Sequence, residues 1–228
     1  MTTVNYAANT SQRTPCVLVL DASASMNTKT PSGRTRLELL NDGIKAFHQA
    51  LHEDEIALSR VQVAAISVGG DDSTAELLMD WTDATDFQPF KLTAGYSTPL
   101  GEGTQLALSI ISSHKKTLRK HGISYTRPWI FILTDGEATD DDDVWAKACD
   151  DAHEAVTTGK AELFLIGVDE AGLEKLSMLS ERPPQLMNSV NFRDLFVWLS
   201  ASLGQIAKSV PGQHVELPST DPWAAVKL

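Results

Sequence analysis

Short oxygen-bearing side chains follow two apolar segments that have the length of β-strands. The segment 16–20 runs into D-A-S-A-S, and the segment 129–133 runs into T-D-G. A third polar stretch, S-T-P-L-G, lies between them. The candidate ligands in these stretches are Asp21, Ser23, Ser25, Thr98 and Asp135. Carboxylate and hydroxyl oxygens are the donors that hard divalent cations prefer, so these residues predict a metal site if the fold brings them together.

The elements that must position these residues are visible as two kinds of apolar pattern. Continuous apolar runs of strand length occur at 16–20, 61–68, 129–133 and 163–168. Continuous hydrophobicity indicates strands buried on both faces, as in a parallel sheet. Helical periodicity separates these runs and predicts helices at 37–51, 102–119, 142–157 and 192–209.

A further strand is predicted at 75–81, reached from Val68 through a short, turn-rich connection that suits an antiparallel hairpin. Strands that alternate with helices of this length predict an α/β fold. The expected architecture is a doubly wound, mostly parallel sheet with one antiparallel edge strand and helices on both faces. Ligands in such folds bind beyond the carboxyl ends of the strands, where Asp21 and Asp135 lie.

Each candidate ligand also has a purely structural interpretation. An Asp after a strand, or a Ser or Thr before a helix, commonly caps the helix by accepting backbone N–H bonds. The order of the residues favours a metal site over helix caps alone. It resembles the metal-ion-dependent adhesion site (MIDAS) of von Willebrand factor A (vWA) domains, with D-x-S-x-S at 21–25, then Thr98, then Asp135.

Two longer stretches, at 121–140 and 182–200, resemble a bacterial subgroup of that family. They are similar to the TerY/YegL-like vWA proteins, which are associated with tellurium-resistance and related stress loci. The likeness covers residues 14–223. It departs from the subgroup at the tip 140–143, four consecutive Asp residues that are more acidic than the resemblance leads us to expect.

The resemblance implies a metal centre and a function. Ser23, Ser25 and Thr98 would be hydroxyl ligands of Mg²⁺, with Ca²⁺ and Mn²⁺ as alternatives. Asp21 and Asp135 would reach the ion directly or through water. The implied function is a protein-binding module whose partner supplies an Asp or Glu carboxylate to the metal, in bacterial stress or tellurium-resistance signalling. A protein kinase or a PP2C-type phosphatase of the same locus is a candidate partner.

Composition excludes several other functions. The 228 residues include 19 basic and 30 acidic ones, a formal charge of −11, which argues against a nucleic-acid partner. No apolar run approaches the roughly 18 residues that cross a bilayer, and the first 14 residues do not resemble a secretion signal, so a cytoplasmic protein without membrane contact is expected. Cys16 and Cys149 lack CxxC spacing and are expected to be buried free thiols.

An enzyme is the alternative from a different functional class. Asp21, at the end of the first strand, could be a phosphorylated nucleophile. Haloacid-dehalogenase-like phosphatases need a second Asp two residues further on, where this chain has Ser23. No G-x-S-x-G or G-x-x-x-x-G-K-[ST] motif occurs. We therefore expect no enzymatic activity. Metal-dependent phosphoryl transfer, and an interaction domain with a vestigial metal site, stay open.

The expected organisation is an N-terminal extension at 1–13, a vWA domain at 14–209 and a C-terminal tail at 210–228. The pattern leaves open whether Trp223 anchors the tail to the domain. The acidic tip at 140–143 is expected to complement the dipole of the helix that follows and to supply its N-cap.

Overall fold

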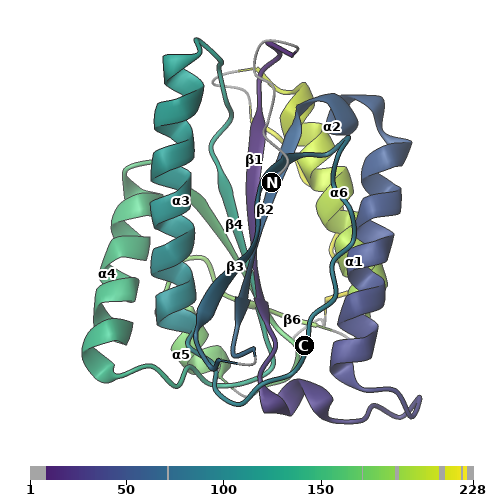
Figure 1. Ribbon diagram of the computed structural model, residues 1–228, viewed down its shortest axis with the longest axis vertical. Coiled ribbons are helices and arrows are strands. Elements are labelled where there is room, and N and C mark those ends of the chain that lie inside the picture. The colour runs from purple at the N-terminus through teal and green to yellow at the C-terminus, as the bar shows by residue number, and fades with distance from the viewer. Residues whose placement is uncertain are drawn as a thin grey trace.

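A six-stranded sheet with helices on both faces forms the body of the computed structural model (Figure 1), which describes residues 9–70, 72–170, 172–187, 190–210, 214–221 and 223–224. The strands are β1 (Thr14–Asp21), β2 (Val61–Val68), β3 (Ala75–Asp83), β4 (Trp129–Thr134), β5 (Glu162–Gly167) and β6 (Gln185–Leu186). The helices are α1 (Arg36–Glu53), α2 (Glu55–Arg60), α3 (Leu100–Lys120), α4 (Asp142–Thr157), α5 (Leu173–Ser177) and α6 (Phe192–Lys208), with a 3₁₀ turn η1 (Ala24–Asn27).

The strand order is β3-β2-β1-β4-β5-β6. All neighbouring strands pair in parallel except β2 and β3, which form an antiparallel hairpin with Val68 opposite Ala75. The turn of this hairpin includes Asp71, which lies outside the described residues. The predicted α/β architecture, with its antiparallel edge, is therefore confirmed. The sequence did not predict α2, α5 and β6, because six, five and two residues are too short to show a periodicity.

Two hydrophobic layers enclose the sheet. Helices α1 and α6 cover one face, and α3 and α4 cover the other (Figure 1). Successive side chains of β1 alternate between them, so that Leu18 packs with the α1/α6 layer and Val19 with the α3/α4 layer. Every residue of β1 is buried. Burial on both faces explains why the strand sequences are continuously apolar.

The C-terminal segment returns to the body of the domain. Trp223 is fully buried and its ring lies 5.2 Å from that of Trp198, centroid to centroid. The Trp198 indole nitrogen donates a hydrogen bond to the Pro218 carbonyl at 2.8 Å. Trp223 thus anchors this segment, which answers the question that the sequence left open. Residues 1–8 of the expected extension, and 211–213, 222 and 225–228 of the expected tail, lie outside the described residues.

Two smaller expectations can be compared with the structure. Cys16 and Cys149 are both buried free thiols, as predicted. Among the described residues, no helix combines the length and the hydrophobicity needed to cross a membrane.

Candidate metal centre

The turn after β1 is shaped by hydrogen bonds of its own polar residues. Asp21, the last residue of β1, is fully buried, and its carboxylate accepts the backbone N–H of Ser23 at 2.7 Å. The chain then turns into η1, whose buried Met26 side chain fixes the turn to the core. Ser23 is buried and Ser25 is exposed. The alternating D-x-S-x-S spacing therefore directs three oxygen-bearing side chains toward the edge of the sheet.

Side chains from β1 and β4 meet at that edge. The hydroxyls of Ser23 and Ser25 lie 2.8 Å apart, and Ser25 Oγ donates to Asp135 Oδ1 at 2.5 Å. Thr134 Oγ1 donates to Asp21 Oδ2, also at 2.5 Å. Two strand ends that are more than 100 residues apart in the sequence are thus joined by two hydrogen bonds between a hydroxyl and a carboxylate.

Thr98 reaches the same place from the loop before α3. A Cβ atom built on Gly136 would lie 3.7 Å from Ser25 Oγ and 4.0 Å from Thr98 Oγ1. Backbone hydrogen bonds hold this loop in position, because Thr98 N donates to Thr139 Oγ1 and Thr139 N donates to the Thr98 carbonyl. The fold therefore brings all five predicted residues together. Metal ligation by them remains a prediction.

The loops that carry these residues interlock through two glycines. Gly69 has a φ of +79°, and a Cβ there would lie 1.8 Å from the Ser97 carbonyl oxygen. A Cβ on Gly95 would lie 1.9 Å from the Gly70 carbonyl oxygen. Neither position has room for a side chain, because the backbone of the β2–β3 turn is in direct contact with the backbone of the loop that carries Thr98.

The electrostatics of the site suit a cation. Burial raises the pKa of the Asp21 carboxyl; hydrogen bonds from Thr134 and Ser23 oppose this rise, and the negative charge of Asp135 adds to it. A cation placed beside both carboxylates would relieve this cost. The donors are all oxygen, which fits a hard ion such as Mg²⁺. Among the described residues there is no group of three or more His, Cys, Asp or Glu arranged for a metal, so the hydroxyls are indispensable to this candidate site.

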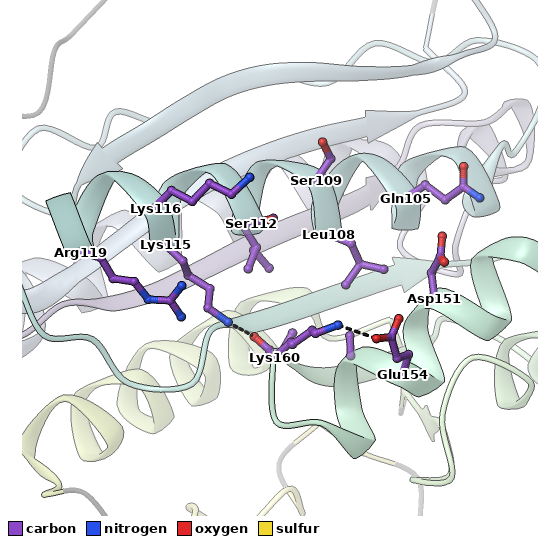
Figure 2. A pocket seen from close by; sticks show the side chains of 13 residues that line it. Gln105, Leu108, Ser109, Ser112, Lys115, Lys116, Arg119, Asp151, Glu154 and Lys160 are labelled. Atoms are coloured by element: carbon purple, nitrogen blue, oxygen red, sulfur yellow. Dashed lines mark hydrogen bonds and ion pairs between the residues drawn. The ribbon is translucent and has the colours of Figure 1, made fainter.

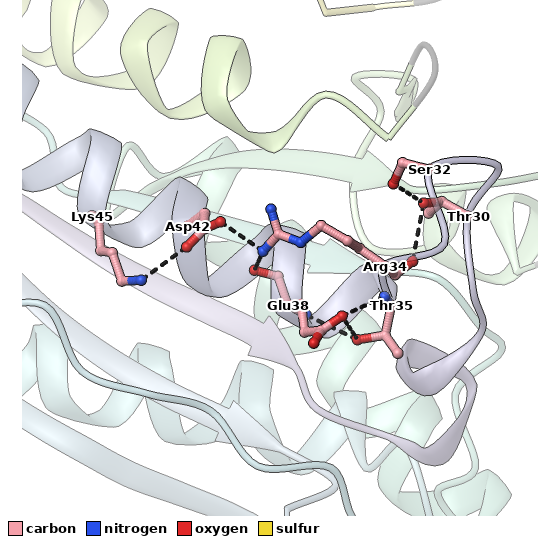
Figure 3. Close-up of polar contacts among 7 residues, drawn as sticks. All are labelled: Thr30, Ser32, Arg34, Thr35, Glu38, Asp42 and Lys45. Carbon is pink, nitrogen blue, oxygen red and sulfur yellow. Dashed lines mark hydrogen bonds and ion pairs between the residues drawn. The ribbon is translucent and has the colours of Figure 1, made fainter.

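Arg36 is a site residue that sequence reasoning missed. Its guanidinium lies 2.8 Å from Asp135 Oδ2 and 2.8 Å from Asp169 Oδ2. Burial acts to lower the pKa of Arg36, but hydrogen bonds and charges of the two carboxylates outweigh it and the pKa is raised. One feature of the sequence could have pointed to Arg36. Thr35 and Glu38 form a capping box (Figure 3), so that α1 begins at Arg36. A cation is unfavourable at the positive end of a helix dipole, so an arginine at this position calls for a partner elsewhere.

The acidic tip caps a different helix from the one expected. The Asp140 carboxylate accepts the backbone N–H groups of Gly101 and Glu102, both at 2.9 Å, at the start of α3. Asp141 is the N-cap residue of α4, yet its side chain makes no capping hydrogen bond. The prediction that the tip caps the following helix with a side chain is therefore wrong. Asp142 and Asp143 do lie in the first turn of α4, where they complement its dipole.

A hollow of about 460 Å³ lies between α3 and α4, away from these loops (Figure 2). Three of its charged residues make contacts there: Lys115 Nζ donates to the Lys160 carbonyl at 3.0 Å, and Lys160 Nζ pairs with Glu154 at 2.6 Å. None of the five candidate ligands lines it. The oxygen-lined edge of the sheet is therefore the candidate functional site.

A family model described as the von Willebrand factor type A domain matches residues 16–137. The match covers more than half of the chain and includes every candidate ligand. The chain belongs to the von Willebrand factor type A family. No curated protein sequence matches this vWA chain, so the TerY/YegL-like subgroup is not established.

Solved structures agree with this vWA assignment. The vWF domain of the type V pili tip protein Mfa5 from Porphyromonas gingivalis has a TM-score of 0.60 at 12% identity, over 83% of this chain and 94% of that one. The pilus adhesin SpaC from Lactobacillus rhamnosus GG has a TM-score of 0.63 at 12% identity, over 86% of this chain and 32% of SpaC. Proximal thread matrix protein 1 from the mussel byssus, with a zinc-occupied MIDAS motif, has a TM-score of 0.54 at 14% identity, over 84% of this chain and 47% of that one.

These identities are low, so the likenesses show the fold alone. The vWA chain spans about a third of the length of SpaC and about half of the mussel protein.

Proposed function

We propose that this vWA chain is a metal-ion-dependent protein-binding module. The observation that carries the proposal is the convergence of three loops, which places the hydroxyls of Ser23, Ser25 and Thr98 beside the carboxylates of Asp21 and Asp135. Mg²⁺ is the ion that we propose, with Ca²⁺ and Mn²⁺ as alternatives. Bound there, it would supply an electrophilic centre that accepts an Asp or Glu carboxylate from a partner protein.

The carboxylates and the hydroxyls of the site would have different roles. The buried Asp21 carboxylate, fixed by Ser23 N–H and the Thr134 hydroxyl, would orient the first loop and balance charge. Neutral hydroxyls from Ser23, Ser25 and Thr98 would hold the ion without adding further negative charge. The site would therefore keep its attraction for an external carboxylate, which is what a protein-binding module needs.

The biological setting is a finer proposal that rests on the TerY/YegL-like resemblance. We propose a role in bacterial stress or tellurium-resistance signalling, in the cytoplasm, with a protein kinase or a PP2C-type phosphatase as partner. Support comes from the sequence likeness at 121–140 and 182–200. The structures named above include a pilus adhesin and a pili tip protein, which favours binding over catalysis.

The phosphoryl-transfer alternative is disfavoured by the position of Asp21. A nucleophilic carboxylate must reach a substrate, whereas Asp21 has no exposed surface. Its oxygens accept hydrogen bonds from Ser23 and Thr134. Such a buried and hydrogen-bonded carboxylate suits a structural and electrostatic role better than covalent chemistry.

Metal titration tests the proposal. Chelator-treated protein is titrated with Mg²⁺ and Mn²⁺ by isothermal calorimetry, together with Asp135→Ala and the Ser23→Ala, Ser25→Ala double variant. We expect specific binding by the wild type and a loss of at least roughly tenfold in affinity in both variants. Ser109→Ala, an exposed serine on α3, is the matched control and should bind like the wild type. Wild-type protein that binds no divalent cation would leave the site vestigial.

A further inference from the structure

Arg36 contacts the carboxylate of the candidate metal centre from the side opposite to the hydroxyls. Asp135 Oδ1 accepts the Ser25 hydroxyl, whereas Asp135 Oδ2 pairs with the Arg36 guanidinium at 2.8 Å. The second guanidinium nitrogen pairs with Asp169 at 2.8 Å. One oxygen of Asp135 therefore faces the site and the other faces a fixed positive charge.

The position of Arg36 is not explained by its helix. The capping box of Thr35 and Glu38 satisfies the start of α1 without it (Figure 3). A cation in the first turn is opposed by the helix dipole. Yet the Arg36 side chain is only 17% exposed and makes two short ion pairs. The carboxylates, rather than the helix, hold this side chain in place.

Charge counting shows what this guanidinium would do. With both carboxylates ionised, Asp21 and Asp135 together would cancel the two charges of a divalent cation. Arg36 adds one positive charge beside them, within direct contact of Asp135. Asp169, which pairs with the same guanidinium, brings the count to zero, whereas without Arg36 it would be −1. An approaching partner carboxylate would therefore meet a less negative site than it would without Arg36, because electrostatic complementarity depends on the summed charge. The same positive charge would oppose the entry of the metal.

We propose that Arg36 is a positioning residue that sets the balance between metal affinity and partner affinity. Its positive charge partly neutralises the Asp135 carboxylate. This lowers the affinity of the site for the metal ion and raises the affinity of the loaded site for an external carboxylate. The inference rests on the proposed metal-dependent binding function. It predicts that removing the Arg36 charge changes metal affinity and carboxylate affinity in opposite directions. A purely structural ion pair predicts no such opposite change.

The test uses Mn²⁺ as the metal probe and acetate as the carboxylate probe. Chelator-treated, full-length protein is titrated with Mn²⁺ by electron paramagnetic resonance. Acetate binding to the Mn²⁺-loaded protein is then followed by water proton relaxation. We expect Arg36→Gln to bind Mn²⁺ at least about fivefold more tightly and acetate at least about threefold more weakly than the wild type. Arg34→Gln, an exposed arginine that pairs with Asp42, is the matched control and should change neither value.

Asp169→Asn supplies the opposite change. Removing this carboxylate leaves the Arg36 charge compensated by Asp135 alone, so Mn²⁺ should bind more weakly and acetate more tightly. If Arg36 only holds loops together, both Arg36→Gln and Asp169→Asn should weaken Mn²⁺ binding, and that result overturns the inference. Unchanged Mn²⁺ affinity in a folded Arg36→Gln protein also overturns it.

Failure of the proposed function is a separate result. It is seen when neither the wild type nor Arg36→Gln binds Mn²⁺, which removes the metal centre and this inference with it. If only Arg36→Gln binds Mn²⁺, the wild-type site is blocked by its own arginine, and that result overturns the proposed balance between two affinities. Circular dichroism melts on each variant establish that it is folded.

Discussion

The carboxylate of Asp140 caps the helix that begins beside Gly101, accepting that residue's backbone N–H at 2.9 Å across 39 positions of sequence. Helix α3 has Pro99 as its N-cap residue, and Pro99 supplies no side-chain acceptor. The missing acceptor comes from the loop after β4 instead. Because Thr98 immediately precedes this helix start, the same contact also positions a candidate ligand.

Replacing Asp140 should therefore affect both stability and the site. We expect Asp140→Ala to lower the free energy of unfolding by about 1 kcal/mol, as for loss of a helix cap, and to weaken Mg²⁺ binding. Asp141→Ala is the matched control, because the Asp141 side chain makes no capping hydrogen bond. Urea denaturation in chelator measures the stability, and calorimetry measures the metal. Equal losses in both variants would contradict this account.

Mg²⁺ should stabilise the folded chain through the candidate site. A ligand at a hundredfold excess over its dissociation constant adds about 2.7 kcal/mol to the folded state. The melting temperature of the wild type should rise by several degrees in Mg²⁺, and that of Asp135→Ala should not. In chelator Asp135→Ala should already melt below the wild type, because Asp135 is buried and its loss leaves Arg36 paired with Asp169 alone. The metal-dependent rise within each protein is therefore the quantity to compare, and an equal rise in both proteins would contradict the assignment of Asp135 to the site.

Trp223 should contribute strongly to stability. Its fully buried ring packs edge-on against Trp198. We expect Trp223→Ala to cost about 3 kcal/mol or more in the free energy of unfolding, the usual range for a large aromatic deletion in a core. Val197→Ala, an exposed apolar position on the same helix as Trp198, should change it by less than about 0.5 kcal/mol. A cost for Trp223→Ala as small as that of the control would refute the anchoring role.

His114 should make stability depend on pH. Burial lowers the pKa of His114 to about 4, and the charge of Arg13 adds to this effect. The ring stacks on Trp81 and its Nε2 lies 2.8 Å from the Gln62 side-chain oxygen, while Gln62 donates to Asp83. The folded state thus holds fewer protons than the unfolded state between pH 6.5 and about 4.

Stability from this group is complete above pH 6.5 and is lost as the pH falls toward 4, at about 1.4 kcal/mol per pH unit. Between pH 7 and pH 5 the wild type should lose about 2 kcal/mol more than His114→Gln in urea denaturation. Parallel pH profiles for the two proteins would show that His114 does not titrate as described.

The sequence predicted those features that depend on local pattern. The apolar runs at 16–20, 61–68, 129–133 and 163–168 all became strands, because both faces of each are covered by helices. The oxygen-bearing residues after β1 and β4 could be expected at one edge, since parallel strands end on the same side.

Other features could not be predicted, because they depend on contacts between distant segments. The Arg36–Asp135 pair joins residues 99 positions apart, and nothing in the neighbourhood of Arg36 specifies its partner. The hydrogen bonds that backbone N–H groups of α3 donate to Asp140 likewise join two separate loops. A run of four aspartates before a helix suggests a cap for that helix, and only the tertiary structure shows that one of them serves its neighbour.

The close approach of Gly69 and Gly95 to neighbouring carbonyl oxygens limits how far this candidate site could be transferred to another fold. A Cβ at either position would lie less than 2 Å from a backbone oxygen of the facing loop. Grafting the segment D-A-S-A-S onto another parallel sheet would therefore copy only three of the five candidate donors, and not their geometry. A designer would have to carry over the β2–β3 turn and the 95–98 loop as well, as one interlocking block.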